Sequence, residues 1–136
     1  MLTPFDQTQT CQSMAEMPSN VRVAYGKCDC VAQALAQNEV MKLIAVDAGD
    51  TVLGIAVKVT AIDAGATDFD IGDGNATARY ADGLSMAVLG YLVTGYATTF
   101  LPYTYAAADT IDLKMIDSSG SRLAKVEVWA IIAKCA

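Results

Sequence analysis

The sequence predicts an all-β protein, built as an antiparallel sandwich. Short segments in which apolar and polar residues alternate recur along the chain, and they are rich in Val and Ile. Clusters of Gly, Asp, Asn and Ser separate these segments at intervals of about ten residues. No long stretch repeats apolar residues with the period of a helix. This combination is typical of an antiparallel sandwich, with a barrel as the alternative.

The N-terminal part of the chain has a different character. Residues 1–20 are polar and follow neither a strand period nor a helix period, so we expect an extended arm. Residues 21–25, VRVAY, alternate as a short strand that ends at Gly26. The next segment, CDCVAQALAQNEV, fits either a weak helical turn or a loop. We therefore divide the chain into an arm with a short strand, 1–39, and a β-sandwich domain, 40–136.

The clearest strand pattern covers residues 51–62, after a strand at 40–46 and a turn at 47–50. Apolar side chains alternate here with small or polar ones. We expect one face to carry Leu53, Ile55, Val57 and Val59, and the other face to carry Gly54, Ala56, Lys58 and Thr60. The first face is expected to lie in the core.

A second strand pattern follows at residues 67–71, after a break at 64–66. It places Phe69 and Ile71 on one face and Asp68 and Asp70 on the other. Its closeness to the strand at 51–62 predicts that the two form a hairpin. The residues that follow Ile71, GDGN, predict a tight turn.

The last part of the sandwich begins less clearly. Residues 84–90 fit either a helix or the start of a strand, and Gly and Pro interrupt the tyrosine-bearing segment beyond them. We expect long connections there. Residues 108–110, Ala-Asp-Thr, repeat the turn chemistry of 49–51, and each turn precedes an alternating strand. The second of those strands is 111–115.

The final strand, 124–135, has one unusual face. Its inward face is expected to carry Val126, Val128, Ala130 and Ile132. The opposite face begins with Lys125 and Glu127 but ends with Trp129 and Ile131. Large apolar side chains are unusual on a strand face that meets water, so we expect a loop or a neighbouring subunit to cover them.

Composition excludes several classes of partner. The formal net charge is −6, and Lys and Arg occur singly, so we expect neither nucleic acid nor an anionic membrane surface as a partner. No apolar stretch approaches the ~20 residues of a membrane span. The N-terminus lacks the basic and apolar regions of a signal peptide, so we expect the chain to act where it is made. Only 18% of residues are charged, which favours a surface partly covered by another subunit.

Catalytic and metal-binding chemistry has little support. The chain contains no His, and Cys28 and Cys30 form C-x-C rather than C-x-x-C, with Cys11 and Cys135 far away. Zinc and a disulfide framework are therefore disfavoured, and we expect thiols, with Cys30 or Cys135 buried as small apolar residues. Without His, nucleophilic catalysis lacks its usual base. Asp68 and Asp70 share a strand face and could act as the carboxylate pair of a glycosidase. The chain has few aromatic residues that could stack on a sugar, which disfavours this activity. We expect no enzymatic activity and no cofactor.

The acidic stretch at residues 68–83, DFDIGDGNATARYADG, is the best candidate for a metal site. Asp70, Asp73 and Asn75 offer oxygen ligands beside glycines, as calcium requires. An EF-hand loop needs a Glu at its twelfth position, and Arg79 or Ala81 stands there instead. A strand followed by a tight turn is the favoured interpretation, and an irregular calcium site is the alternative.

Four segments together resemble a known family. They are VLGIAVKVTAI, FDIGDGN followed by ARYADGLSM, YAAADTIDLKMID and the closing KVEVWAIIA, and they span roughly residues 40–135. Their order and style resemble the head decoration, or cement, proteins of tailed bacteriophages. Similar segments also occur in β-modules of phage head fibres and tails.

The resemblance implies a jelly-roll-like sandwich that forms a homotrimer on the outer surface of the phage head. It implies a structural virion protein, assembled in the host cytoplasm, that stabilises contacts between major capsid subunits. The Trp129 and Ile131 face would be buried in that assembly. Contacts are also expected from the loop tyrosines, each of which could equally lie at the edge of the core: Tyr91, Tyr96, Tyr103 and Tyr105. The alternative function is a receptor- or glycan-binding module of a head fibre or tail.

Overall fold

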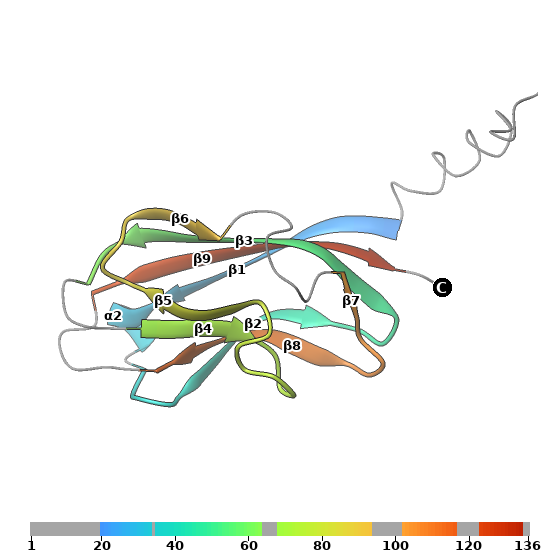
Figure 1. Cartoon of the computed structure of the whole chain (residues 1–136), viewed down its shortest axis with the longest axis horizontal. Coiled ribbons are helices and arrows are strands. Elements are labelled where there is room, and N and C mark those ends of the chain that lie inside the picture. Colours follow the sequence, from blue (N-terminus) through green and yellow to red (C-terminus); the bar gives the residue numbers. More distant parts are fainter. Residues whose placement is uncertain (1–19, 34, 64–67, 94–101, 117–122, 135–136) are drawn as a thin grey trace, which may run out of the picture.

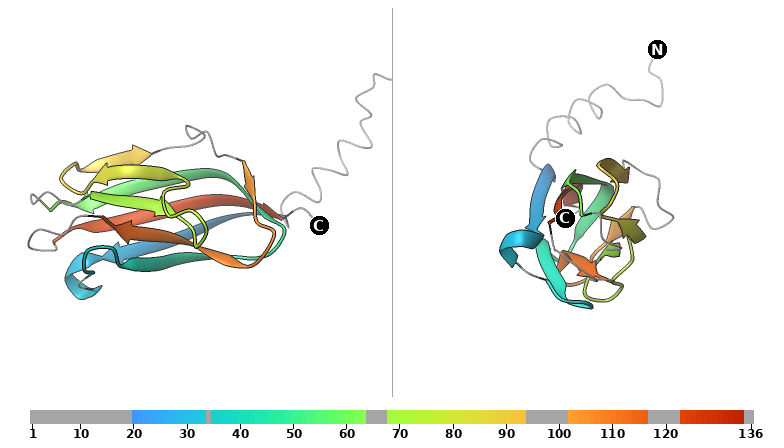
Figure 2. Two further views of the ribbon diagram at one scale, coloured as in Figure 1. Left: turned by 60° about the horizontal axis from the view of Figure 1, so that its bottom comes forward. Right: turned by 90° about the vertical axis from the view of Figure 1, so that its left-hand side faces the viewer.

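The chain folds as a sandwich of two antiparallel β-sheets (Figure 1, Figure 2). The computed structural model describes residues 20–33, 35–63, 68–93, 102–116 and 123–134. The predicted all-β sandwich is confirmed. The part of the predicted arm that precedes residue 20 lies outside the described residues.

The first sheet has the strand order β1-β9-β3-β6, and β7 also pairs with β3. Its strands are β1 (Val21–Asp29), β3 (Asp50–Ala61), β6 (Gly90–Val93), β7 (Tyr103–Thr104) and β9 (Lys125–Lys134). Strands β1 and β9 come from opposite ends of the described chain and pair over nine residues, from Val21 with Ala133 to Asp29 with Lys125.

The second sheet has the strand order β2-β8-β4-β5. Its strands are β2 (Val40–Val46), β4 (Asp68–Gly72), β5 (Ala81–Ser85) and β8 (Asp109–Met115). One helical turn, α2 (Cys30–Gln33), follows β1, which settles the ambiguity at that point of the sequence. The two predicted Asp-Thr turns lead into strands as expected. Strand β3 begins at Asp50, and strand β8 begins at Asp109.

The core lies between the two sheets and consists of the faces that alternation predicted. The first sheet contributes the fully buried side chains Val57, Val59, Val126, Val128, Ala130 and Ile132. The second sheet contributes Phe69, Ile71, Ile111, Leu113 and Met115. Period-two alternation therefore identified correctly which side of β3, β4 and β9 meets the core.

One inward position differs from the prediction. The register between β3 and β9 shifts between Val52 and Gly54, as in a β-bulge. The shift turns Val52 fully into the core and leaves Leu53 half-buried. Alternation alone does not reveal such a shift, because the extra residue changes the face of every residue on one side of it.

The predicted hairpin between residues 51–62 and 67–71 is wrong. Strand β3 belongs to the first sheet, where it pairs with β9, β6 and β7, whereas β4 belongs to the second and pairs with β8 and β5. The chain crosses between the sheets after β3, so the apolar faces of β3 and β4 belong to opposite sides of one core. Two strands can each bury an apolar face by pairing in one sheet. They can also do so by packing against each other from opposite sheets.

Residues 84–90 form the end of a strand and a turn. Strand β5 ends at Ser85 and β6 begins at Gly90, whose φ of 102° lies in the left-handed region that favours glycine. The turn between them, residues 86–89, brings the chain from the second sheet to the first.

Strand β1 closes one side of the sandwich against β2. A Cβ atom on Gly26 would lie 2.6 Å from the carbonyl oxygen of Leu43, so only glycine fits this approach. The sequence placed the end of the strand at this residue. The strand instead continues through it to Asp29, because β9 provides a partner along the whole length.

Candidate functional site

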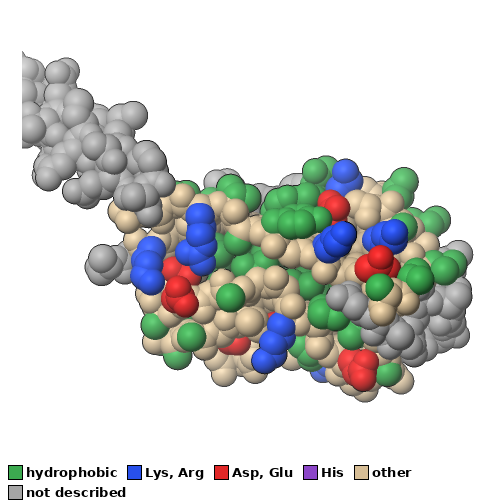
Figure 3. Space-filling view, turned by 180° about the vertical axis from the view of Figure 1, so that it is seen from behind, with side chains coloured by type: hydrophobic (Ala, Val, Ile, Leu, Met, Phe, Trp, Pro, Cys, Tyr) green, Lys and Arg blue, Asp and Glu red, His purple; other side chains and the backbone are tan. Residues whose placement is uncertain are grey.

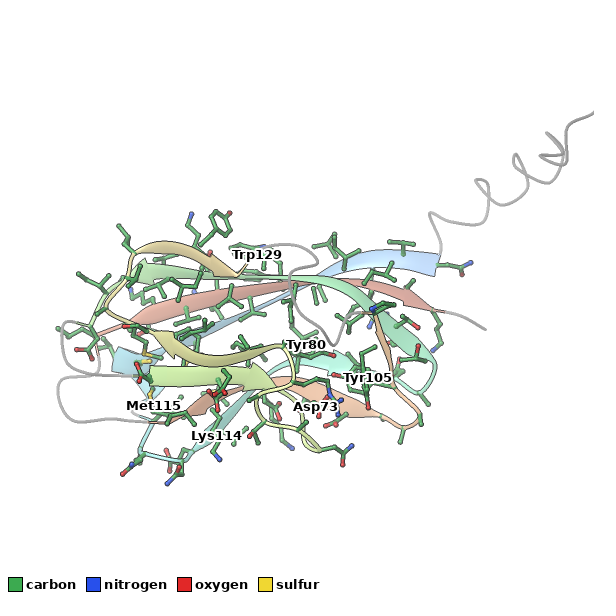
Figure 4. The ribbon with its side chains drawn as sticks, in the orientation of Figure 1. Asp73, Tyr80, Tyr105, Lys114, Met115 and Trp129 are labelled. Carbon is green, nitrogen blue, oxygen red and sulfur yellow. The ribbon has the colours of Figure 1, made fainter. Side chains whose placement is uncertain are left out.

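The outer face of the first sheet carries an apolar groove, which is here called the aromatic groove. Trp129 and Ile131 of β9 point away from the core, and their cross-strand partners on β1 are Tyr25 and Val23. Figure 3 shows hydrophobic side chains gathered on this side of the molecule beside basic and acidic ones, and Figure 4 shows Trp129 on the outside of the sandwich. The groove has a volume of about 330 Å³ and is lined by Val23, Gly54, Ile55, Ala56, Tyr91, Trp129 and Ile131.

Three aromatic rings cluster at the groove, which Trp129 and Tyr91 line and Tyr25 borders. The ring of Trp129 lies 5.3 Å from that of Tyr25 and 6.2 Å from that of Tyr91, measured between ring centroids. The two tyrosines are 49% and 58% exposed. Because all three rings are mounted on paired strands, the cluster presents a large area in a fixed arrangement.

Charged groups border the aromatic cluster. The Tyr25 hydroxyl donates a hydrogen bond of 3.0 Å to Glu127, and the Lys58 ammonium lies 5.0 Å from the centroid of the Tyr91 ring. Partial desolvation and then the bond to Glu127 raise the pKa of Tyr25. An apolar centre with a polar border is the usual anatomy of a protein interface.

A second apolar surface lies at one end of the sandwich and is here called the apolar tip. It consists of Ile62, Val88, Leu89 and Leu123, which are 46%, 52%, 67% and 54% exposed. The buried Asp63 links the three loops that carry them. Its N–H donates to the carbonyl of Met86 at 3.0 Å, and its carboxylate accepts the N–H of Leu123 at 3.2 Å.

Asp73, the central residue of the calcium hypothesis, is buried and fully engaged. Its carboxylate accepts the N–H groups of Asn75 at 3.0 Å and Ala76 at 2.8 Å. It also pairs with the Arg79 guanidinium and accepts the Tyr105 hydroxyl at 3.0 Å. Burial alone would raise the pKa of this carboxyl, but the hydrogen bonds, that from Arg79 foremost, hold the pKa below its usual value.

The other two calcium candidates, Asp70 and Asn75, differ from Asp73 in their surroundings. Asp70 accepts the N–H of Gly83 at 2.8 Å, and burial raises the pKa of its carboxyl. Asn75 is exposed. Within the described part of the chain, no three acidic, His or Cys side chains lie close enough together to hold a metal ion. The acidic stretch forms strand β4 and then a turn in which Asp73 accepts the N–H groups of Asn75 and Ala76, as the favoured interpretation predicted.

The predicted tyrosines divide between the two regions. Tyr91 lies at the aromatic groove, whereas Tyr105 is only 3% exposed and belongs to the Asp73 network. Tyr103 lies beneath the Arg79 guanidinium, 3.8 Å from ring centroid to Cζ, and edge-on to Tyr105. The core-edge alternative therefore describes Tyr105. Tyr96 lies outside the described residues.

The contribution of β1 to this surface was not anticipated from the sequence. Val23 and Tyr25 alternate with polar neighbours in β1, and this period placed them on one face. Nothing in the sequence shows that this face continues the face of Trp129, because β1 and β9 are about a hundred residues apart. The apolar tip was missed because residues 84–90 fitted both a helix and a strand.

The two described cysteines are inert core residues. Cys28 and Cys30 are each 1% exposed, so the expected burial of Cys30 is confirmed. Their sulfurs lie 3.9 Å apart, which is a hydrogen-bond contact and not a disulfide. The contact with Cys30 and then burial raise the pKa of Cys28, so it remains a thiol. Cys11 and Cys135 lie outside the described residues.

Two of the comparisons with known proteins are negative. No family model matches the chain, and no curated protein matches it. In the described part of the structure, no helix is long and apolar enough to cross a membrane.

Three solved structures of phage capsids contain chains with the same fold. A chain of the cyanophage Pam1 capsid asymmetric unit superposes with a TM-score of 0.65 at 14% identity, over 85% of this chain and 86% of that one. A chain from the acid-stable capsid of Helicobacter pylori bacteriophage KHP30 gives 0.62 at 16% identity, over 84% and 87%. A chain of the Ralstonia phage GP4 capsid gives 0.64 at 10% identity, over 86% of each. At these identities the likeness shows a shared fold.

Proposed function

We propose that this chain is a structural virion protein, a decoration or cement protein of a phage head. It binds the outer surface of the head and stabilises contacts between major capsid subunits. Three chains from phage capsids that share the fold over nearly their whole length support this proposal. The observation that carries it is the aromatic groove, an apolar hollow on the outer face of the first sheet.

The groove has the chemistry of a binding surface. Trp and Tyr are the residues that contribute most energy at protein interfaces, and here they stand next to one another around Trp129. Their rings are held by strands, so little conformational entropy is lost when a partner covers them. Glu127 and Lys58 supply the polar border. A protein partner of mixed apolar and charged surface fits this face.

Two buried carboxylates are held by partners within the fold, and we propose binding without turnover. Asp73 pairs with Arg79, and the buried Asp50 accepts the Arg22 guanidinium at 2.9 Å and the Asp47 N–H at 2.9 Å. A catalytic carboxyl must be able to reach a substrate. Both carboxylates are held by neighbouring groups of the same chain, Asp50 through its Oδ2 oxygen alone. The sequence has no His to act in their place.

The proposed partners are the major capsid protein and further copies of the chain itself, as a homotrimer. The net charge of −6 disfavours nucleic acid, because a DNA-binding surface must neutralise phosphates with Lys and Arg. The proposed location is the surface of the phage head, after assembly in the host cytoplasm.

The experiment is cosedimentation with shells purified from a phage genome that lacks this gene. The wild-type chain should bind these shells saturably. The double variant Trp129→Ser and Tyr91→Ser should fold normally and lose at least tenfold in affinity, because it removes two anchors of the groove. Lys42→Ser, an exposed substitution on β2 of the other sheet, is the matched control and should bind like the wild type. Equal binding by all three proteins would reject the groove as the capsid-binding surface.

A second function is favoured by one observation. The groove is open, is about 330 Å³ in volume, and combines aromatic rings with a nearby carboxylate, which suits a small ligand such as a sugar. We therefore keep a receptor- or glycan-binding module of a head fibre or tail as the alternative. Saturable binding to a glycan array that Trp129→Ser abolishes, without binding to shells, would favour it.

A further inference from the structure

Lysine side chains border the aromatic groove on the outer face of the first sheet. Trp129 lies in a row with its cross-strand partners on β1 and β3. Two residues further along the strands, the next row on the same face consists of Lys27, Glu127 and Lys58. Lys125 lies on this face too, two residues from Glu127 on β9. Figure 3 shows basic side chains beside the hydrophobic ones on this side of the molecule.

The row next to the groove carries more positive than negative charge. Lys27 and Lys58 are both cross-strand partners of Glu127, so two ammonium groups share one carboxylate. That carboxylate accepts the Tyr25 hydroxyl at 3.0 Å. Among the ion pairs of the described residues, none includes Lys27 or Lys58. Both lysines can therefore accept a carboxylate from a partner.

The lysines of the second sheet have a different environment. Lys42 is the cross-strand partner of Asp112, and Lys114 is the cross-strand partner of Asp70, so each has a carboxylate of its own. Figure 4 shows Lys114 and Trp129 on opposite sides of the sandwich. The net charge of the whole chain is −6. The pair of lysines that shares one carboxylate is thus a local feature of the face that carries the groove.

The position of Lys58 ties this charge to the groove. Its ammonium lies 5.0 Å from the centroid of the Tyr91 ring, and Tyr91 lines the groove. A partner that covers this ring therefore removes water from the ammonium as well. Taking a charge out of water costs free energy unless an opposite charge replaces the water. A partner that fills the groove should bring that opposite charge with it.

We propose that the segment of the phage head that occupies the aromatic groove is both apolar and acidic. Its apolar side chains lie in the groove, and its carboxylates bind Lys27 and Lys58. This inference rests on the proposed function, because it takes the major capsid subunits as the partner. It goes beyond that function by giving the sign of the partner's charge.

The spacing of the two rows predicts a pattern in the partner. The row of Trp129 and the row of Glu127 are two residues apart along the strands, which is about 7 Å. An extended segment also presents side chains on one face at every second residue. A segment that runs along the strands therefore matches both rows with an apolar residue followed, two positions later, by Asp or Glu.

The test is cosedimentation with shells from a phage genome that lacks this gene, using the full chain. Lys27→Glu combined with Lys58→Glu should bind at least tenfold more weakly than the wild type, because like charges then face each other. Lys42→Glu combined with Lys134→Glu is the matched control. It changes the net charge equally at two exposed positions that do not line the groove, and it should bind like the wild type. Circular dichroism checks that each variant folds.

A milder variant removes the charges without adding acidic groups beside Glu127. Lys27→Gln combined with Lys58→Gln should bind several-fold more weakly than the wild type at about 50 mM salt and approach it at about 500 mM, because salt screens the lost attraction. The partner is tested by amidating the surface carboxylates of the shells with a carbodiimide and methylamine. Amidated shells that remain intact by electron microscopy should bind the wild type at least tenfold more weakly.

Three results would overturn the inference. They are wild-type or tighter binding by the folded Lys27→Glu and Lys58→Glu variant, an equal loss in the matched control, and unchanged binding to intact amidated shells. If these results came with a loss of binding by the Trp129→Ser and Tyr91→Ser variant, the cement role would stand and the inference alone would fail. A wild-type chain that does not bind unmodified shells would reject the cement role, and this inference with it.

Discussion

At the scale of single residues, Asp73 has hydrogen-bond partners both next to it and far from it in the sequence. Its side chain bonds the two N–H groups that follow in the turn, and a sequence with Asp before Gly and Asn anticipates such a turn. Its other partners, Arg79 and Tyr105, lie 6 and 32 residues away. No sequence pattern shows that these three side chains meet in the fold. The sequence therefore indicated the acidic residues but not their hydrogen-bond partners.

Replacing Asp73 should therefore cost stability. In Asp73→Asn the Arg79 guanidinium loses its charged partner while remaining largely buried, so the free energy of unfolding should fall by roughly 3 kcal/mol. Urea denaturation at neutral pH measures it. Asn75→Ala, which changes an exposed neighbour, should lie within about 0.5 kcal/mol of the wild type. A variant as stable as the wild type would show that the network contributes nothing.

The same residue predicts a pH dependence. The pKa of Asp73 in the folded chain lies below its unfolded value, so its contribution is complete above the unfolded pKa of about 3.9 and is lost as pH falls through the folded pKa. The difference in unfolding free energy between wild type and Asp73→Asn should stay constant from pH 7 to 5 and shrink below about pH 4. Denaturant titrations across this range test it, and a difference that grew on acidification would have the wrong sign.

Calcium should have no effect on stability. The donors around Asp73 already include a guanidinium, and Asp70 is directed to the Gly83 N–H. We expect the same melting temperature in millimolar calcium and in excess chelator, with magnesium as the control cation. An increase in melting temperature specific to calcium would revive the hypothesis of a site at Asp70, Asp73 and Asn75.

At the scale of elements, the faces of the strands could be predicted and their neighbours could not. Alternation assigned the inward side of β3, β4 and β9 because one face of each meets the core. It could not show that β3 and β4 belong to different sheets, since the period of a strand is the same whether the next strand pairs with it or faces it. The bulge at Val52 and Gly54 was hidden for the same reason.

Strand β1 provides a test at this scale. Gly26→Ala introduces a Cβ atom against the backbone of Leu43, and backbone cannot move aside as a side chain can. We expect a loss of about 1–3 kcal/mol of unfolding free energy, the usual cost of overpacking. The neighbouring Lys27→Ala changes an exposed side chain and should be nearly neutral. If the two variants were equally stable, β1 would not close against β2 as described.

At the scale of the whole molecule, the candidate surface combines strands from distant parts of the sequence. Trp129 and Ile131 were recognised because they are out of place on one strand, and that anomaly was the part of the site available before the fold was known. The groove itself requires β1, β3 and β6 on either side of β9, an arrangement set by strand pairing over long sequence separations.

The molecule thus presents two apolar surfaces, one on a sheet face and one at the end of the sandwich. A single apolar patch would be enough for one partner. Two patches in different directions suit a chain that contacts neighbours on more than one side, as a component of a shell must. The proposed cement role uses the surface on the sheet face, the aromatic groove.

Electron microscopy of purified phage heads tests the cement role most directly. Heads produced without this gene would be imaged before and after addition of the purified wild-type chain. The proposal predicts new density of sandwich size on the outer surface, at symmetry-related positions, that is absent when the Trp129→Ser and Tyr91→Ser variant is added. Heads with an unchanged outer surface at saturating concentrations of the wild-type chain would contradict it.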